Sequence, residues 1–110
     1  MITSPANEKL KLVRGDVVDE LPRLLEPRRP GALTVVFHTA LLGYVEPERR
    51  KLVYRALHAA GAAGPLAVVS SGQPRARVDD YWGLWIQIWP GGERVLLAEA
   101  DFHGAWLEWL

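Results

Sequence analysis

The sequence predicts an α/β domain with a mixed sheet of about five strands, in which a parallel first part with crossover helices is followed by a C-terminal antiparallel hairpin. Three observations predict this fold. Over its first two thirds the chain alternates strand-like apolar segments with helical ones, an order that implies parallel pairing. In the last third, apolar side chains instead recur at every second residue, and the chain contains a Pro-Gly-Gly turn. A length of 110 residues is that of one domain.

The first predicted elements are short. Residues 1–8 are polar and without periodicity, so we expect a flexible tail there and a single domain over residues 9–110. Residues 10–13 predict a first strand that stops at a Gly-Asp pair. A short helix follows, for which Asp19 is the expected N-cap. Pro22 then falls among the first four helical residues, whose N–H groups have no helical acceptor.

Two further strands flank the strongest predicted helix. Residues 33–37 are β-branched and aromatic without polar alternation, which is typical of a strand covered on both faces. After a connecting turn, Pro47 opens a helix whose apolar positions keep a helical spacing and which ends at Gly61 and Gly64. Residues 66–69 predict another buried strand. The order strand, helix, strand, helix, strand predicts that all three strands are parallel.

The last third predicts an antiparallel hairpin. Apolar and other side chains alternate from Trp82 to Trp89, and an extended run at residues 94–100 follows the glycine turn. Trp85 and Trp89 fall on the face opposite Trp82, so both faces of this strand carry large apolar side chains. We expect one face to pack on the core and the other to meet a helix or another subunit. Residues 105–110 predict a short strand or turn folded back onto the sheet.

Composition excludes several classes of function. Thirteen basic and thirteen acidic residues balance, so we expect neither a nucleic acid nor a membrane as partner. The absence of cysteine excludes thiol catalysis, disulfides and cysteine-ligated zinc. The chain shows neither an export signal nor a run of about 20 apolar residues. We therefore expect a soluble, cytoplasmic protein.

Polar residues follow each predicted parallel strand, at the sheet edge where open α/β folds bind ligands. Asp16 could accept hydrogen bonds from a ribose or an amine, or satisfy N–H groups of its own turn. His38 could act as an acid, a base or a ligand, or as a hydrogen-bonded rim residue. Residues 70–72, Ser-Ser-Gly, could contact a phosphate or a sugar. They lack the spacing of a P-loop, so a plain loop is the simpler interpretation.

Other residues give weaker signals. Asp101, His103 and Glu108 could form a carboxylate–imidazole pair, but no serine or threonine nucleophile can be assigned to them. The five tryptophans lie in the last third, where they could stack on a base, a sugar or a partner, or fill the space beside the hairpin. We assign no catalytic and no metal-binding residue.

Several motifs resemble a known family in their order along the chain. They are GDVVDELP at residues 15–22, VVFHTALLGYV at 35–45, PERR at 47–50 and HGAWLEW at 103–109. From about Leu12 to the end, the chain resembles the C-terminal part of an uncharacterised bacterial family, the domain of unknown function 2332. The segment after residue 69 departs from the resemblance, since the family tends to carry a Glu-Gly-Pro-like turn where this chain has SSGQP.

The same motifs are similar, more distantly, to the second half of class I S-adenosylmethionine-dependent methyltransferases, which implies a truncated Rossmann-like sheet. The resemblance implies that Asp16 lies near the adenine and that His38, Thr39 and Tyr44 lie beside the cofactor and the substrate. Those enzymes hold the cofactor with a glycine-rich turn and an acidic residue on the first two strands, and neither precedes Lys9 here. We therefore expect no bound cofactor.

Two hypotheses follow from this resemblance. The favoured one is a non-catalytic, methyltransferase-like domain that acts by forming homodimers or by binding a protein partner, because an uncovered buried-type strand is an association site. The alternative is a cofactor-binding half of an S-adenosylmethionine-dependent methyltransferase that another chain completes. A sugar- or nucleotide-binding module built on the tryptophans is a third, supported by composition alone.

Overall fold

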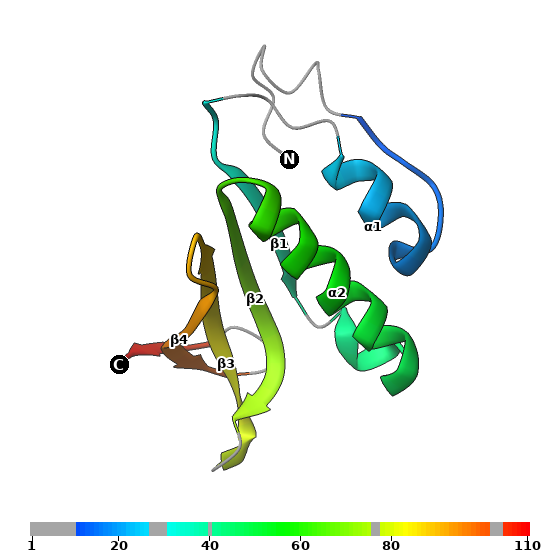
Figure 1. Cartoon of the computed structure of the whole chain (residues 1–110). Helices are drawn as coiled ribbons and strands as arrows, with labels where there is room; N and C mark the ends of the chain where they lie inside the picture. The colour runs from blue at the N-terminus through cyan, green and yellow to red at the C-terminus, as the bar shows by residue number, and fades with distance from the viewer. Residues whose placement is uncertain (1–10, 27–30, 40, 76–77, 102–104) are drawn as a thin grey trace.

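The computed structural model describes residues 11–26, 31–39, 41–75, 78–101 and 105–110. The described strands form one sheet in the order β1-β2-β3-β4-β5, so each strand lies beside its neighbours in the chain (Figure 1). The elements are α1 (Val17–Leu25), β1 (Thr34–Thr39), the 3-10 helix η2 (Leu42–Tyr44), α2 (Pro47–Ala63), β2 (Leu66–Arg75), β3 (Val78–Trp89), β4 (Glu93–Ala100) and β5 (Leu107–Trp109). No helix among these is long and apolar enough to cross a membrane.

The sheet is mixed, as the sequence predicts, but its parallel part is smaller than expected. Only β1 and β2 are parallel, and α2 connects them, whereas β2 to β5 pair antiparallel in succession. The predicted strand at residues 10–13 is wrong for the described residues 11–13, which are not in a strand, and Leu12 is 90% exposed. So short an apolar segment buries too little surface to offset the entropy of ordering it.

The predicted hairpin is confirmed as β3 and β4. Its turn contains Gly91 and Gly92, whose φ angles of 110° and 72° are rare for any residue with a Cβ atom. The amide of Gly92 donates to the carbonyl of Ile88 at 2.8 Å, and the Gln87 Nε2 donates to the carbonyl of Gly92 at 2.7 Å. The short closing strand is confirmed as β5, which pairs with β4.

Helix α1 begins one turn earlier than the sequence suggests. The expected N-cap, Asp19, lies inside the first turn, and Asp16 is the residue that caps the helix. The Asp16 Oδ1 accepts a hydrogen bond from the Val18 amide at 2.8 Å, which satisfies one of the free N–H groups at the helix start. Pro22 therefore stands in the second turn of the helix.

Replacing this cap tests the assignment. We expect Asp16→Ala to lower the free energy of unfolding by about 1 kcal/mol, because the helix loses its side-chain acceptor. Asp19→Ala is the matched control and should have the smaller effect, since it removes a carboxylate near the positive end of the helix dipole and a long, exposed ion pair with Arg49, but no cap. Urea denaturation of both variants measures the difference. An Asp19→Ala effect larger than that of Asp16→Ala would contradict the assignment.

Helix α2 supplies most of the helical side of the core. Pro47 is its first residue, as predicted, but the helix continues through Gly61 to Ala63, and Gly64 is the C-cap. A Cβ atom on Gly61 would lie 2.3 Å from Cγ of Trp89, so the missing side chain allows the helix to approach the indole closely. The buried core joins both helices to the sheet and consists of Val18, Leu25, Leu42, Val53, Leu57, Leu66, Val68 and Trp89.

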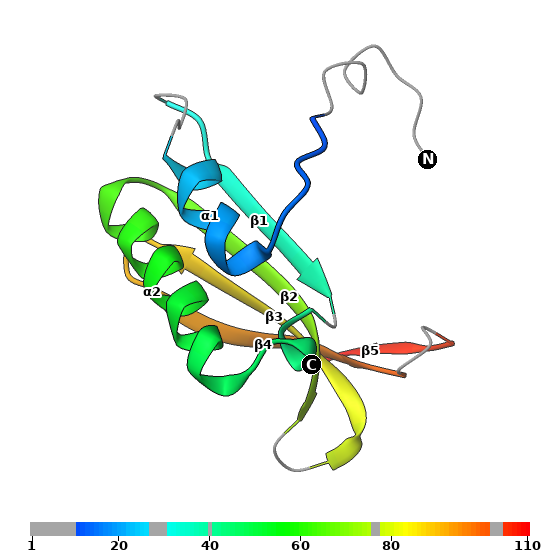
Figure 2. The same cartoon turned by 90° about the vertical axis from the view of Figure 1, so that its right-hand side faces the viewer.

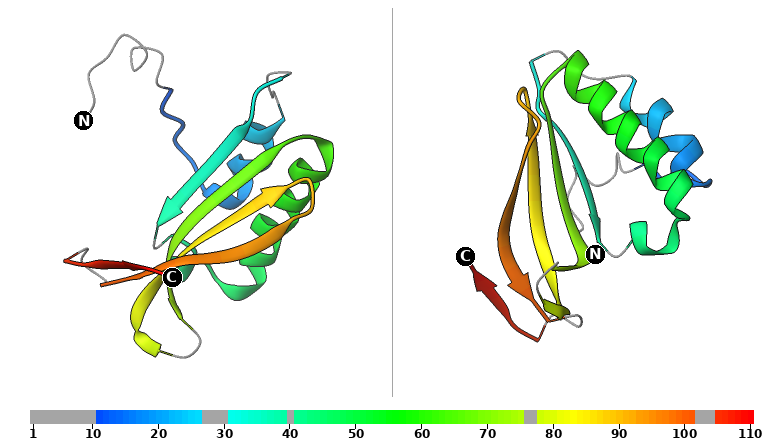
Figure 3. Two further views of the ribbon diagram at one scale, coloured as in Figure 1. Left: turned by 90° about the vertical axis from the view of Figure 1, so that its left-hand side faces the viewer. Right: turned by 60° about the horizontal axis from the view of Figure 1, so that its bottom comes forward.

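Both helices lie on the same face of the sheet (Figure 2), and Figure 3 shows no helix of the described residues on its other face. Burial in β1 alternates strictly, with Val36 packed against the core and with Val35 and Phe37 exposed. The prediction that this strand is covered on both faces is therefore wrong for the described residues. The sequence pattern is that of a two-sided strand, but only one side is occupied.

Candidate functional site

A cavity of about 210 Å³ lies between α2 and the sheet, next to the carboxyl ends of the parallel pair β1 and β2. This is the sheet edge at which α/β folds bind ligands. Parallel pairing places His38 of β1 beside Ser70 of β2, and residues of α2 line the opposite side of the cavity. The described residues that line the cavity are His38, Leu42, Tyr54, Leu57, His58, Val68, Ser70, Ser71, Gly72, Trp85, Ile86, Gln87 and Arg94.

Arg94 gives the cavity its positive charge. It lies on β4 opposite Gln87 of β3, and its guanidinium carbon is 4.1 Å from the centroid of the Trp85 ring. A guanidinium over an indole face is held by a cation–π interaction, which fixes its orientation without neutralising its charge. None of the described lining residues is an aspartate or a glutamate. The positive charge therefore has no counterion within the described lining.

His38 also lines the cavity, and one of its ring nitrogens is unsatisfied. Its Nδ1 is buried and has no hydrogen-bond partner among the described residues. Burial lowers the pKa of His38 below its usual 6.5, and the charge of Arg94 lowers it further. The imidazole is therefore neutral at pH 7, so one ring nitrogen can donate a hydrogen bond and the other can accept one. A buried polar atom left without a partner is a position where a ligand or water can bind.

The lowered pKa of His38 predicts a pH-dependent stability. Because the unfolded chain takes up a proton near pH 6.5 and the folded chain only at a lower pH, the free energy of unfolding should fall as the pH decreases through this interval. In His38→Gln this part of the decrease should disappear. Urea denaturation at several values between pH 7.5 and pH 5 measures it. His58→Gln, which retains His38, is the matched histidine control, and parallel profiles for wild type and His38→Gln would contradict the prediction.

Helix α2 forms the outer wall of the cavity. Tyr54, Leu57 and His58 lie one helical turn or less apart, so their side chains share one face of the helix. The His58 ring also meets Trp89 edge to face, with 5.2 Å between the ring centroids. This contact joins the wall of the cavity to the core residue Trp89.

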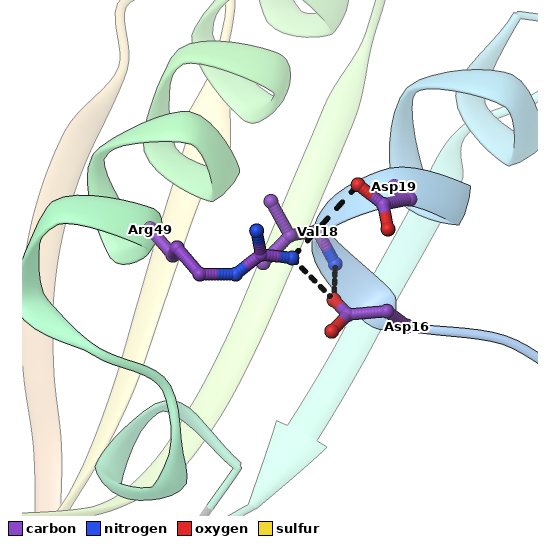
Figure 4. Close-up of polar contacts among 4 residues, drawn as sticks. All are labelled: Asp16, Val18, Asp19 and Arg49. Carbon is purple, nitrogen blue, oxygen red and sulfur yellow. Dashed lines mark hydrogen bonds and ion pairs between the residues drawn. The ribbon is translucent and has the colours of Figure 1, made fainter.

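Of the four residues that the sequence nominates, the structure places His38 in the lining of the cavity. Asp16 is engaged elsewhere, since it caps α1 and its Oδ1 lies 3.3 Å from Nη2 of Arg49 on α2 (Figure 4). The same guanidinium lies 3.8 Å from the Asp19 carboxylate. These contacts join the starts of the two helices, in line with the structural interpretation of Asp16.

Thr39 and Tyr44 do not line the cavity. Thr39 is the last residue of β1 and is exposed on the face away from the helices, as its place two residues after Phe37 requires. Tyr44 ends η2 and is 90% exposed. The Ser-Ser-Gly segment at residues 70–72, in contrast, does line it, although as part of β2 and not as a loop.

Three residues that line the cavity, Arg94, Tyr54 and His58, are not predicted as site residues from the sequence. Arg94 sits in a strand where a single basic residue is ordinary, and Tyr54 and His58 belong to the polar positions of a surface helix. Only the β3–β4 register brings Arg94 to the helix-covered face. The strand register is a signal that could have found it. Val68 faces the core and pairs with Gln87, and Gln87 pairs with Arg94, so Arg94 lies on the same face of the sheet as Val68.

The bare face of the sheet is the second candidate for function. The register aligns two rows of side chains across β1 to β4 on this face. One row runs from Val35 through Ala67 and Ile88 to Glu93. The other row consists of Phe37, Val69, Ile86 and Val95. We call these two rows the open face; four of its side chains, Val35, Phe37, Ile88 and Val95, are between 45% and 66% exposed.

The remaining candidates take structural places. Asp101 accepts a hydrogen bond from the Ala105 amide at 3.3 Å, which closes the turn before β5, and His103 lies outside the described residues. Trp106 packs edge to face on Tyr81, with ring centroids 4.9 Å apart. Trp89 is in the core, Trp85 lines the cavity, and Trp82 and Trp109 lie in β3 and β5. The tryptophans therefore do not form one stacking platform in the described part of the chain.

Fold and cavity together define a small mixed α/β domain with a ligand-sized cavity on one side of its sheet and, on the other, an apolar face that no described helix covers. The chain belongs to the family described as "Uncharacterized protein conserved in bacteria (DUF2332)", whose model matches residues 2–109. No curated protein matches the chain. No solved structure matches it either. The comparisons thus support the family and not the likeness to methyltransferases.

Proposed function

We propose that the domain functions through association, and that a second copy of the chain covers its open face. The observation that carries this proposal is the exposure of Val35 and Phe37 in a strand whose sequence is that of a two-sided, buried strand. Contiguous apolar surface of this kind on a monomer marks an interaction site. The same proposal includes the assignment derived from the resemblance, a methyltransferase-like domain without catalysis. A domain that acts by association needs no catalytic residues of its own.

The edge of the sheet supports association as well. β1 is a terminal strand of the sheet, and no described strand pairs with its outer edge. Exposed edges are usually blunted by lysine, proline or a bulge, and the sequence of β1, TVVFHT, contains none of these. A partner strand can therefore add to β1, with main-chain hydrogen bonds at the edge and apolar contacts on the adjoining open face.

A second copy suits this surface for two reasons. The open face carries a single charged residue, Glu93, at the far end of one row, so two such faces meet without bringing like charges together at their centre. A twofold axis also places the same strand against itself in antiparallel orientation, which is the arrangement that symmetric dimers use. A different protein would have to supply a matching apolar face, and nothing in the charge pattern selects one.

Mass measurement tests the proposal directly. The chain has a mass of 12.3 kDa, and we expect sedimentation equilibrium over a concentration series to show a monomer–dimer equilibrium that reaches twice this mass. High salt should leave the equilibrium unchanged or strengthen it, because the contact is apolar. A constant mass of one chain up to millimolar concentration would rule out the second copy as occupant.

The alternative proposal is a half-site for S-adenosylmethionine that another chain completes. Its support is the position of His38 in a cavity at the carboxyl ends of two parallel strands. The cavity is smaller than a nucleoside cofactor needs, so another chain would have to supply most of the contacts. Thermal unfolding with S-adenosylmethionine at a hundredfold excess over the dissociation constant would show a stabilisation of about 2.7 kcal/mol, and no shift disfavours it.

A further inference from the structure

From the contents of the cavity we infer that it is a binding site for a small carboxylate with a compact apolar body, whose anionic end lies at Arg94 and His38. The inference does not depend on association, because His38 and Arg94 lie on the helix-covered side of the sheet, and of the open face only Ile86 is among the described lining residues. It rests on the charge, the hydrogen-bonding groups and the size of the cavity.

The charge of the cavity selects an anion. Arg94 contributes a guanidinium, the described lining contains no carboxylate, and Trp85 orients the guanidinium without neutralising it. A guanidinium presents two parallel N–H groups, a geometry that matches a carboxylate. A bound carboxylate would supply the counterion that the described lining lacks.

The hydrogen-bonding groups give the anion a second contact. His38 lines the cavity, and its neutral imidazole can carry its proton on either ring nitrogen. A carboxylate has two oxygens and several lone pairs, so it can accept from the imidazole as well as from the guanidinium. Binding would thereby add a hydrogen bond from the imidazole in the cavity lining to the contact with the guanidinium.

The size and the apolar wall limit the rest of the ligand. A volume of about 210 Å³ exceeds by a modest amount the roughly 150 Å³ cavity that is known to hold benzene. Leu42, Leu57 and Val68 line its inner side and require an apolar group there. An aromatic or branched aliphatic acid of about the size of benzoate meets both conditions.

Titration of the full chain with benzoate tests the inference. Two-dimensional NMR of the ¹⁵N-labelled protein should show saturable shifts at the Trp85 indole and at β4, with a dissociation constant on the order of 1 mM. Benzamide has the same shape without the charge and should bind at least tenfold more weakly. Phenyl phosphate distinguishes the anion, and tighter binding of phenyl phosphate than of benzoate would overturn the carboxylate assignment.

A matched pair of variants locates the contact. Arg94→Gln should weaken benzoate binding at least tenfold, and Arg55→Gln, which removes an exposed arginine of α2 outside the cavity, should leave it unchanged. Both residues are exposed, so the spectra should confirm that both variants fold. Equal affinity for benzamide and benzoate, no saturable shift with benzoate, or unchanged affinity in Arg94→Gln would each overturn the inference. Displacement of benzoate by micromolar S-adenosylmethionine would do so too, in favour of the cofactor site.

Discussion

Trp89→Ala is expected to lower the free energy of unfolding by about 3–5 kcal/mol, the largest effect of any single substitution that we consider. The indole is 7% exposed and lies in the core, where β2 pairs it with the fully buried Leu66. Its ring fills the space that Gly61 leaves on α2 and meets His58 edge to face. Truncation would remove a large apolar surface and leave a cavity between helix and sheet that the backbone of α2 cannot close.

Chemical denaturation of the two tryptophan variants Trp89→Ala and Trp106→Ala measures this difference. Trp106→Ala is the matched control, because Trp106 lies near the surface and its principal aromatic contact is Tyr81, so we expect a loss of about 1 kcal/mol. A typical domain has a stability of about 5–15 kcal/mol, so Trp89→Ala should also lower the midpoint visibly. Similar losses for both variants would show that Trp89 is not the centre of the core.

The local elements were predictable where the sequence signals are local. Pro47 at the start of a helical apolar pattern predicts α2, and alternation around two glycines predicts the β3–β4 hairpin; the structure confirms both. Helix α1 was placed correctly but capped incorrectly. Two aspartates three residues apart can each serve as an N-cap, and packing of Val18 against the core selects the earlier one, Asp16.

Features that depend on the whole sheet were harder to predict. An apolar strand pattern shows how many sides a strand can bury and not how many are buried, so β1 was expected to be covered on both faces. Whether a short segment pairs with a strand depends on the sheet edges available to it, and the described residues 11–13 are in no strand. The strand-exit rule located His38, but it could not find Arg94, whose position depends on the register between β3 and β4.

Phe37→Glu is expected to abolish self-association. The side chain is 66% exposed at the outer strand of the open face, between the free edge of β1 and Val69. In a symmetric dimer each substitution occurs twice, once on each chain, and places two carboxylates in an apolar contact. Central aromatic residues of interfaces contribute 2 kcal/mol or more, so we expect the dissociation constant to rise at least about a hundredfold.

The folded monomer should tolerate this change, which makes the test specific to association. A residue as exposed as Phe37 contributes little to the core, and its substitution should alter the stability of the monomer by no more than about 1 kcal/mol. Leu24→Glu on α1 introduces the same charge at a 52% exposed leucine on the opposite side of the sheet and should leave the dimer intact. Sedimentation equilibrium of the two variants decides the matter: if both dissociate equally, the charge itself prevents association, and if neither does, the dimer forms through a surface other than the open face.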